Sequence, residues 1–536
     1  MDMHANATTG RNTALIYARL EERIMARDQV GASEVFYELV RAGRPLNEII
    51  AEGVRIHAPY THVPYHERID DGYPNFVNND HCLLSARATL HLTKLLPDDL
   101  AMLPMAQTIW YIPTGLDIWN QKINRAPGHY TRGFAGRIES PPAPVVYWPD
   151  QQPLHSDAPL QERLGDWLTM VQRGQVVDAY RSFLGLMEDK VNRRHVLAEL
   201  VFAGLIDVQD RLYRNRSYTT GHKAYRARST VELGNALGWD NARNVIYAGA
   251  LDIAVGPRWH SLYEMACNTV KEEIEGVALH AVPYGGVAEA ELAMLRNTAP
   301  LTAEEEFALL RALLHEHSPA NLDCVTQMLK AGKDPRRIID VIQIAAAEIV
   351  LATHGVNNFS MPMHCYEYTN ALAWFYDTFD HPRRLRLLYV AAEFVNMTAW
   401  HQKLIDAFAP SPILTPACAR NFDEDELLQQ IDAAVCSLNG PESLSWVQAY
   451  CGIVADRTAL VRTLALAACK LGNDPHNQEI PQNMLEDFAK NQSPRRDRLL
   501  LACAQHCAAH RKYGDPLEAA RRFGKGMNVA IDQFAA

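Results

Sequence analysis

The stretch NFSMPMHCYE at residues 358–367, followed by PRRLRLL at residues 382–388, decides how this chain is interpreted. When the segment is shifted without a gap so that His364 falls on His476, it also matches PRRDRLL at residues 494–500. This many identities in one ungapped register indicate a repeated unit. The unit is predicted to be a helical hairpin that begins near a histidine.

Two weaker copies of this unit precede it. Aligning His364 with His222 brings Tyr389 onto Tyr247. Near the N-terminus the spacing NF-x4-HC recurs and ends with His81-Cys82. The sequence therefore predicts about four imperfect helical-hairpin repeats in one array or closed assembly. The predicted boundaries are unit one at 1–130, a Pro-rich loop at 131–160, unit two at 161–285, unit three at 301–410 and unit four at 421–536.

The composition excludes several classes of protein. Apolar residues make up 48% of the chain, which is enough for a substantial core, so a disordered protein is excluded. The net charge is −11 and no Lys/Arg stripe stands out, which argues against a nucleic-acid partner. We find no apolar export signal and no apolar run of roughly 18 residues, so no membrane association is expected. The ten cysteines form no CxxC pair, which is typical of a reducing cytoplasm.

The hydrophobic periodicity predicts an all-α fold, because alternation of strand length is nearly absent. Two helices are expected within residues 12–42, and they should end at Gly43, since glycine suits a helix C-terminus. Thr302 with Glu305 three residues later predicts a capping box at the start of another helix. Polar residues interrupt the apolar segment 338–352 at helical spacing, which predicts a buried helix.

The repeated histidines are the leading candidates for chemistry. In each predicted unit a histidine follows loop residues and precedes a helix: His81, His222, His364 and His476. In the first helical turn the helix dipole favours neutral imidazole, which is the form that binds a metal. Glu367 and Glu479 lie three residues after His364 and His476, on the same helix face. Imidazole nitrogen combined with carboxylate oxygen suits iron, manganese or zinc.

Two interpretations of these histidines stay open. In a linear solenoid, equivalent residues lie one repeat apart, so each histidine would only bond to its own loop. If the units close around an axis, the four histidines can share one metal. A second tier of metal or pocket candidates comprises the two glutamates, two Trp-His pairs and a His/Tyr cluster between prolines: Glu367, Glu479, His260, His401, His57, His62 and His66. The alternatives are that the Trp-His pairs are packed core and that the cluster is a surface turn.

The face formed by Cys503, His506, Cys507 and His510 has helical spacing, but four residues of one straight helix cannot surround a tetrahedral ion. In the repeat register His506 corresponds to Phe394, which is a core-type position. The sequence therefore predicts buried thiols beside a hydrogen-bonded histidine. Nucleotide-binding and hydrolase motifs such as GxxxxGK[ST], GxSxG and HExxH are missing from the sequence.

The sequence HCYEYTNAL at residues 364–372, with LLYV at 387–390, resembles two groups of helical proteins. One is the questin oxidase-like family, and the other is the helical module that accompanies Rieske ferredoxin domains in some bacterial proteins. The likeness covers the repeat units through short motifs. Questin oxidase-like proteins are cofactor-sparing oxygenases of polycyclic quinones, and at least one type binds non-haem iron through several histidines and a carbamylated lysine. The resemblance implies a metal role for the repeated histidines, but it leaves the lysine open among Lys122, Lys223, Lys271 and Lys403.

These observations predict a non-haem metal-dependent oxidoreductase of the oxygenase type that acts on an organic, aromatic or quinone-like small molecule. Iron is the expected metal, with zinc or manganese as alternatives. Because Rieske ligand motifs are missing from the sequence, electrons would come from a separate electron-transfer protein or from the substrate. Four aromatic residues would line a substrate pocket or belong to the core: Tyr225, Tyr366, Tyr368 and Trp374. The alternative functions are a non-enzymatic scaffold that binds a protein partner and a metal-dependent hydrolase.

Overall fold

The computed structural model describes residues 2–58, 63–70, 73–77, 81–118, 151–208, 221–254, 261–275, 286–353, 360–405, 413–472, 475–509 and 515–531. Most of these residues are helical, which confirms the all-α prediction. Within the described ranges no helix combines the length and the apolar character that crossing a membrane requires.

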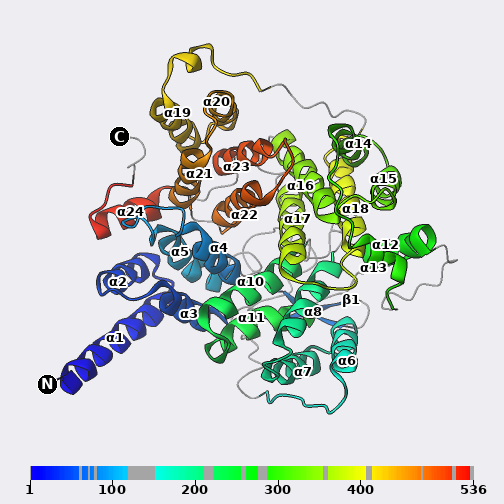
Figure 1. The fold of residues 1–536 in the computed structure, drawn as a ribbon. Helices are drawn as coiled ribbons and strands as arrows, with labels where there is room; N and C mark the ends of the chain where they lie inside the picture. Colours follow the sequence, from blue (N-terminus) through cyan, green and yellow to red (C-terminus); the bar gives the residue numbers. More distant parts are fainter. Residues whose placement is uncertain are drawn as a thin grey trace.

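The chain forms successive groups of helices that run around the molecule from blue to red in Figure 1. The first group contains α1 (Asp2–Met25), α2 (Gln29–Arg41), α3 (Leu46–His57), α4 (Cys82–Leu92) and α5 (Leu103–Ile118). The second contains α6 (Leu160–Gln172), α7 (Val176–Glu188), α8 (Arg193–Ile206), α10 (His222–Leu237), the 3-10 turn Trp239–Asn241 and α11 (Arg243–Ala254). A connecting segment follows, with α12 (Ser261–Thr269), the π-helical turn Val270–Glu275 and α13 (Glu289–Met294).

The remaining helices form two further groups. The third contains α14 (Ala303–Leu314), α15 (Ala320–Lys330), α16 (Pro335–Ala352), α17 (Ser360–Thr378) and α18 (Arg386–His401). The fourth contains the 3-10 turn Ala417–Asn421, α19 (Glu424–Cys436), α20 (Gly440–Ile453), α21 (Thr458–Lys470), α22 (His476–Lys490) and α23 (Asp497–Ala509). The last described helix is α24 (Glu518–Met527), which packs against α2 and α5 of the first group.

Local sequence signals set several helix boundaries. The Thr302 side chain accepts a hydrogen bond from the backbone N–H of Glu305, and the Glu305 carboxylate accepts one from the N–H of Thr302, so the predicted capping box is confirmed. Gly43, with φ of 67°, follows the end of α2, as expected for a glycine at a helix C-terminus. The apolar segment 338–352 lies within α16, and most of that helix is buried.

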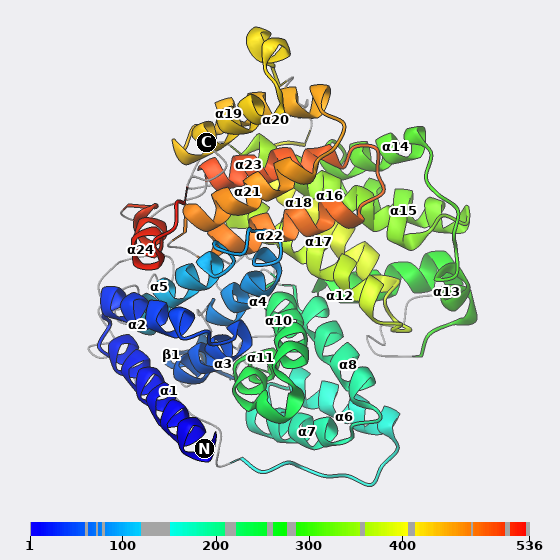
Figure 2. The same cartoon turned by 60° about the vertical axis from the view of Figure 1, so that its left-hand side comes forward.

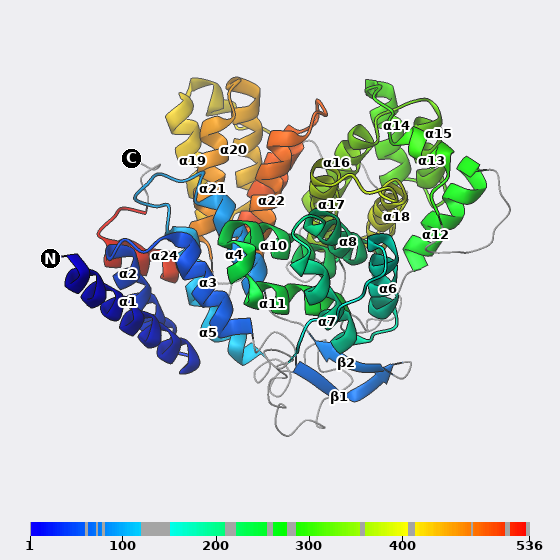
Figure 3. The same ribbon diagram turned by 60° about the horizontal axis from the view of Figure 1, so that its bottom comes forward.

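The prediction of helices alone missed one β-hairpin. Strands β1 (Val63–Asp70) and β2 (Tyr73–Val77) pair antiparallel between α3 and α4. Figure 3 shows the hairpin at the opposite end of the molecule from α19 and α20. Pro64 and Pro74 obscure the alternation of this segment, since proline is uncommon inside strands.

Four helices that each belong to a different group form a closed ring, called the helix ring here: α4, α10, α17 and α22. Helix α4 contacts α10 and α22, and α17 contacts the same two helices. The blue α4 and the orange α22 are neighbours although most of the chain separates them (Figures 1 and 2). Each member also packs against the helix before it and the helix after it, which are α3 and α5, α8 and α11, α16 and α18, and α21 and α23. The ring helices and these outer helices share the apolar core, which leaves the inner face of the helix ring for polar side chains.

Candidate metal centre

Each member of the helix ring carries one of the predicted histidines near its N-terminus. His81 is the N-cap residue of α4, while His222 and His476 are the first residues of α10 and α22. His364 is the fifth residue of α17, because that helix begins earlier than the sequence predicts. Closure of the helix ring therefore brings the four histidines, called the histidine cluster here, to one place.

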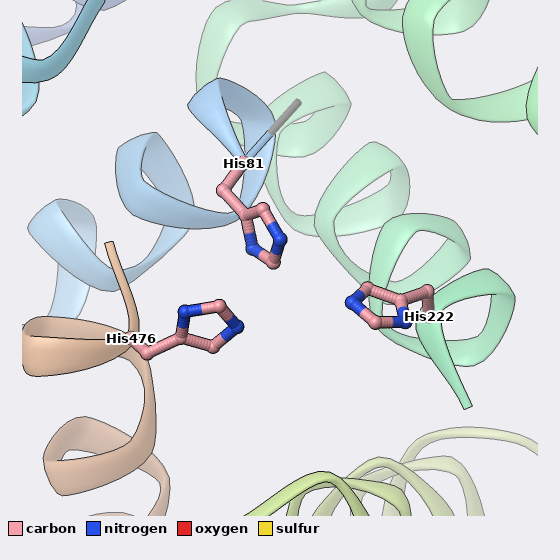
Figure 4. Close-up of side chains that lie close together, drawn as sticks. All are labelled: His81, His222 and His476. Atoms are coloured by element: carbon pink, nitrogen blue, oxygen red, sulfur yellow. The ribbon is translucent and has the colours of Figure 1, made fainter. Parts of the chain in front are cut away.

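The imidazoles of the histidine cluster form a closed quadrilateral. Neighbouring ring centres are 5.3 Å apart for His81 and His222, and 4.5 Å for His222 and His364. The other two sides are 5.4 Å for His364 and His476, and 4.3 Å for His476 and His81. One nitrogen of each of His81, His222 and His476 lies within 4.8 Å of the other two. Figure 4 shows these three side chains converging from α4, α10 and α22.

These separations match those of imidazoles around one ion. With metal–nitrogen bonds of about 2.1 Å, the centres of neighbouring imidazoles lie roughly 4.5–5 Å apart for square or tetrahedral angles. The four measured sides fall close to this range. The ring centres therefore lie close enough for one ion, but the donor atoms that lie within 4.8 Å of one another belong to His81, His222 and His476, and His364 is not in that group. The linear-solenoid alternative, with its histidines one repeat apart, does not describe this arrangement.

Two carboxyl groups lie at the same end of the helix ring. Glu479 is fully buried, and its Oε2 lies 3.4 Å from Nδ1 of His81. Glu367 is also buried, and its Oε2 has no hydrogen-bond partner among the described residues. A buried carboxylate oxygen without a donor is costly, and a bound cation would remove that cost. The His-x-x-Glu spacing of α17 and α22 thus brings two carboxyl groups near the histidine cluster, outside the group of donor atoms that lie within 4.8 Å of one another.

Burial shifts the titration of this cluster towards uncharged groups. Burial, together with the proximity of His364, holds the pKa of His222 well below its usual value. Burial and the neighbouring Glu479 raise the pKa of Glu367 well above its usual value. Neutral imidazole is the metal-binding form, so His222 is ready to bind an ion. A bound cation would lower the pKa of Glu367 and favour its charged form, because a cation stabilises the carboxylate.

A second set of polar side chains, called the polar layer here, occupies the ring helices six residues after each histidine: Arg87, Arg228, Asn370 and Gln482. Arg87 donates to Gln482, and Arg228 donates to Oδ1 of Asn370 over 2.5 Å. Asn370 in turn donates to Asp487 over 2.9 Å. Burial and the proximity of Glu486 raise the pKa of Asp487 to about 7. The polar layer links all four ring helices and lies between the histidine cluster and the C-terminal ends of these helices.

The other second-tier histidines do not join the cluster within the described residues. His57 is the last residue of α3 and is buried, but it is not in the group whose ligand atoms lie close together. His401 ends α18 beside Trp400, which is 48% exposed, so the prediction of a packed core indole is wrong for this pair. His62 and His260 lie outside the described residues, and His66 falls on β1 with its side chain outside them.

The Cys503–His506–Cys507 face of α23 is buried, as predicted, and Nε2 of His506 donates to the backbone carbonyl of His476 over 2.9 Å. This bond fixes the start of α22, so His506 supports the histidine cluster from outside. His510 lies outside the described residues. Sequence reasoning missed this support because the repeat register gives only a core position for His506.

The aromatic candidates are core residues with internal partners. Tyr225 donates to the backbone carbonyl of His364, and Tyr366 donates to Asp487 over 2.7 Å. Tyr368 donates to the carbonyl of Leu205 over 2.8 Å, and Trp374 lies under the guanidinium of Arg228. These contacts favour the alternative in which the four aromatic side chains stabilise the fold.

Among the candidate lysines, Lys223 is buried in an ion pair with Asp207, and Lys122 lies outside the described residues. Lys271 is in the π-helical turn and Lys403 follows α18. Lys223, the residue next to His222, is thus already committed to a buried carboxylate. No protein-family model, curated protein or solved structure was found to match the chain.

Proposed function

We propose that the protein is a non-haem metal oxygenase whose ion is held by the histidine cluster. His81, His222 and His476 are the principal ligands, with His364 as the fourth nitrogen donor. The observation that carries this proposal is the closed quadrilateral of four imidazoles, three of them buried and His476 partly buried, each contributed by a different group of helices. The four groups are the repeats of one five-helix unit, in which the fourth helix carries the histidine.

Iron is the proposed metal, because four nitrogen donors combined with one carboxylate oxygen suit iron(II) and leave one octahedral position open. Glu367 or Glu479 supplies the carboxylate that at least one type of questin oxidase-like protein takes from a carbamylated lysine. When iron is bound, an open position gives it the capacity to bind and activate dioxygen. The chain's own groups fix the imidazoles and exclude water, since all members of the cluster except His476 are buried.

The substrate class follows from the resemblance and is an organic small molecule of aromatic or quinone type. The electrons for the oxygenation come from the substrate itself or from a separate electron-transfer protein. We place the protein in the cytoplasm, where its ten cysteines, all within the described ranges and none in a disulfide, would stay reduced.

Metal content and oxygen dependence test this function. Purified protein is expected to contain about one equivalent of iron by elemental analysis, and to consume dioxygen with members of a panel of polycyclic quinones and phenols. Metal-free protein with full stability would favour the scaffold that binds a protein partner. Turnover that needs the metal but proceeds equally well without dioxygen would favour a hydrolase.

Replacing Glu367 with glutamine is expected to weaken metal binding at least about tenfold, because a donor oxygen that responds to the cation's charge is lost. The stability of the metal-free protein should change by less than about 1 kcal/mol, since burial already disfavours the charged carboxylate and glutamine resembles the neutral acid. Titration with iron(II) under anaerobic conditions and thermal unfolding of the metal-free protein measure the two effects.

Glu486→Gln is the matched control for this substitution. Glu486 accepts a hydrogen bond from Arg228 over 2.6 Å and also pairs with Lys490, so its loss should lower stability and leave metal affinity near the wild-type value. Unchanged metal affinity in Glu367→Gln would remove this carboxylate from the proposed ligand set.

A further inference from the structure

A pocket of about 590 Å³ lies at the far end of the helix ring from the histidine cluster. It is bordered by the C-terminal parts of α4 and α22 and by the N-terminal end of α21. Glu486 in its wall is ten residues beyond His476 on α22, which corresponds to about 15 Å along a helix. The polar layer lies between the two, so the pocket is a separate site, and its volume is in the usual range for small-molecule sites.

Basic side chains outnumber acidic ones in the lining of this pocket. Lys94, Arg457, Arg462 and Arg496 line it together with only two acidic residues, Asp456 and Glu486. This excess of positive charge occurs in a chain whose net charge is −11. A local field of this sign attracts anions.

Both acidic groups already have partners. The Asp456 carboxylate accepts hydrogen bonds from the backbone N–H and the hydroxyl of Thr458. Glu486 accepts from Arg228 and pairs with Lys490. The charge of Glu486 is therefore matched by Arg228 and Lys490, while Asp456 keeps its charge and acts on Arg457.

The basic side chains differ in whether they already form an ion pair. Arg457 pairs with Asp497 over 2.8 Å and donates to the carbonyl of Cys451, so it is part of the pocket's frame. Across the described ranges, no ion pair is found for Lys94, Arg462 or Arg496. These three exposed cations are therefore the groups that can bind an anionic ligand.

An apolar wall lies beside these cations. Leu95, Val461, Leu485 and Phe488 line the pocket, and the Arg496 guanidinium lies 5.0 Å from the centre of the Phe488 ring. Arginine held over an aromatic face remains able to donate from its edge to an anion. Leu485 and Phe488 are buried, and Leu95 and Val461 are partly exposed. An inorganic anion would leave the exposed part of this wall in water, whereas an anion with an apolar body would cover it.

We propose that this pocket binds a small aromatic anion, with its carboxylate or phosphate between Lys94, Arg462 and Arg496 and its rings against Leu95, Val461, Leu485 and Phe488. The positive charge of the basic side chains favours an anionic group, and the apolar wall favours a ligand whose remaining part is apolar. The site stands on its own residues and does not depend on a metal in the histidine cluster.

Calorimetric titration of the full-length protein as purified tests the proposal with three probes: 1-naphthyl phosphate, 1-naphthoate and inorganic phosphate. A naphthyl anion is expected to bind with a dissociation constant below about 1 mM and at least about tenfold more tightly than inorganic phosphate. Comparison of the phosphate and carboxylate probes identifies the preferred anionic group. Raising the salt concentration should weaken binding several-fold, since the cations are exposed.

Lys94→Ala and Arg462→Ala are each expected to weaken binding of the preferred probe about fivefold or more, and the double variant should weaken it further. Both side chains are exposed, so these proteins should fold normally. Arg420→Ala is the matched control, because Arg420 is an exposed arginine outside the pocket lining, and its affinity should equal that of wild type. The proposal is overturned if neither naphthyl probe binds saturably, if inorganic phosphate binds as tightly as both of them, or if the double variant retains wild-type affinity.

Discussion

His222→Ala protein is expected to fold and to contain no bound metal. His222 is one of three histidines whose nitrogens lie within 4.8 Å of one another, and burial keeps it in the neutral form that binds metal. Losing one of so few donors should cost far more than the roughly 10–100-fold that follows from changing a residue behind a ligand. Elemental analysis after dialysis measures the metal, and circular dichroism verifies the fold. His364→Ala should lose affinity by at least about tenfold, but less than His222→Ala.

His381→Ala is the matched control for a buried histidine outside the cluster. Nε2 of His381 lies 3.1 Å from Glu199, and the ring stacks on Phe202. Its loss should lower the free energy of unfolding by about 1–3 kcal/mol and leave the metal content unchanged. Wild-type metal content in His222→Ala, or equal metal loss in both variants, would contradict the proposed centre.

The metal affinity of His506→Ala protein is expected to lie between those of His222→Ala and His381→Ala. Because His506 bonds to the backbone carbonyl of His476, its removal loosens the start of α22 without removing a ligand. The repeat register alone places His506 at a core position and predicts unchanged metal binding in the variant. The bond to His476 is the reason to expect a loss instead. A loss of metal affinity within about 10–100-fold is the expected result.

Arg228→Met should produce the largest loss of stability, on the order of 3–5 kcal/mol, because it breaks a buried ionic network and leaves its acidic partners behind. Arg228 is 1% exposed and donates to Asn370 of α17 and to Glu486 of α22. It also pairs with Glu232 on its own helix and lies over the Trp374 ring. Chemical denaturation of the metal-free protein measures the loss without a contribution from metal binding.

Arg19→Met is the control for Arg228→Met. Arg19 pairs with Glu38 over 2.9 Å, but the side chain is 51% exposed and the pair is screened by water, so the loss should be far smaller than that of Arg228→Met. Similar losses in the two variants would mean that the polar layer contributes no more to stability than a surface ion pair.

The sequence predicted elements whose signals are local. The capping box at Thr302 and the buried helix at 338–352 depend on a few neighbouring residues and on helical periodicity, and both are found. The β-hairpin was missed because it depends on pairing between two short strands interrupted by proline. The longer α17 also moved His364 out of the first turn, since helix starts are hard to place where no capping residue marks them.

The candidate site required tertiary information. The register related the four histidines to one another, but it left open whether the units lie in line or close around an axis. Contacts between α4 and α22, at opposite ends of the chain, decide this question. The polar layer follows the same register, six residues after each histidine, and was available in the sequence. It was missed because arginine, asparagine and glutamine at equivalent positions look unrelated until their hydrogen bonds to one another are known.

Closure of the helix ring has a consequence for the timing of synthesis. His81 and Glu479, which lie 3.4 Å apart in the folded protein, are separated by 398 residues in the chain. At about 5–20 residues per second, a ribosome needs roughly 20–80 s to make the second after the first. During that interval His81, and later His222 and His364, have been synthesised, but His476 and Glu479 of α22 have not. A chain that ends before α22 therefore cannot assemble the proposed centre, and metal binding by a nascent chain would indicate that α22 has been synthesised.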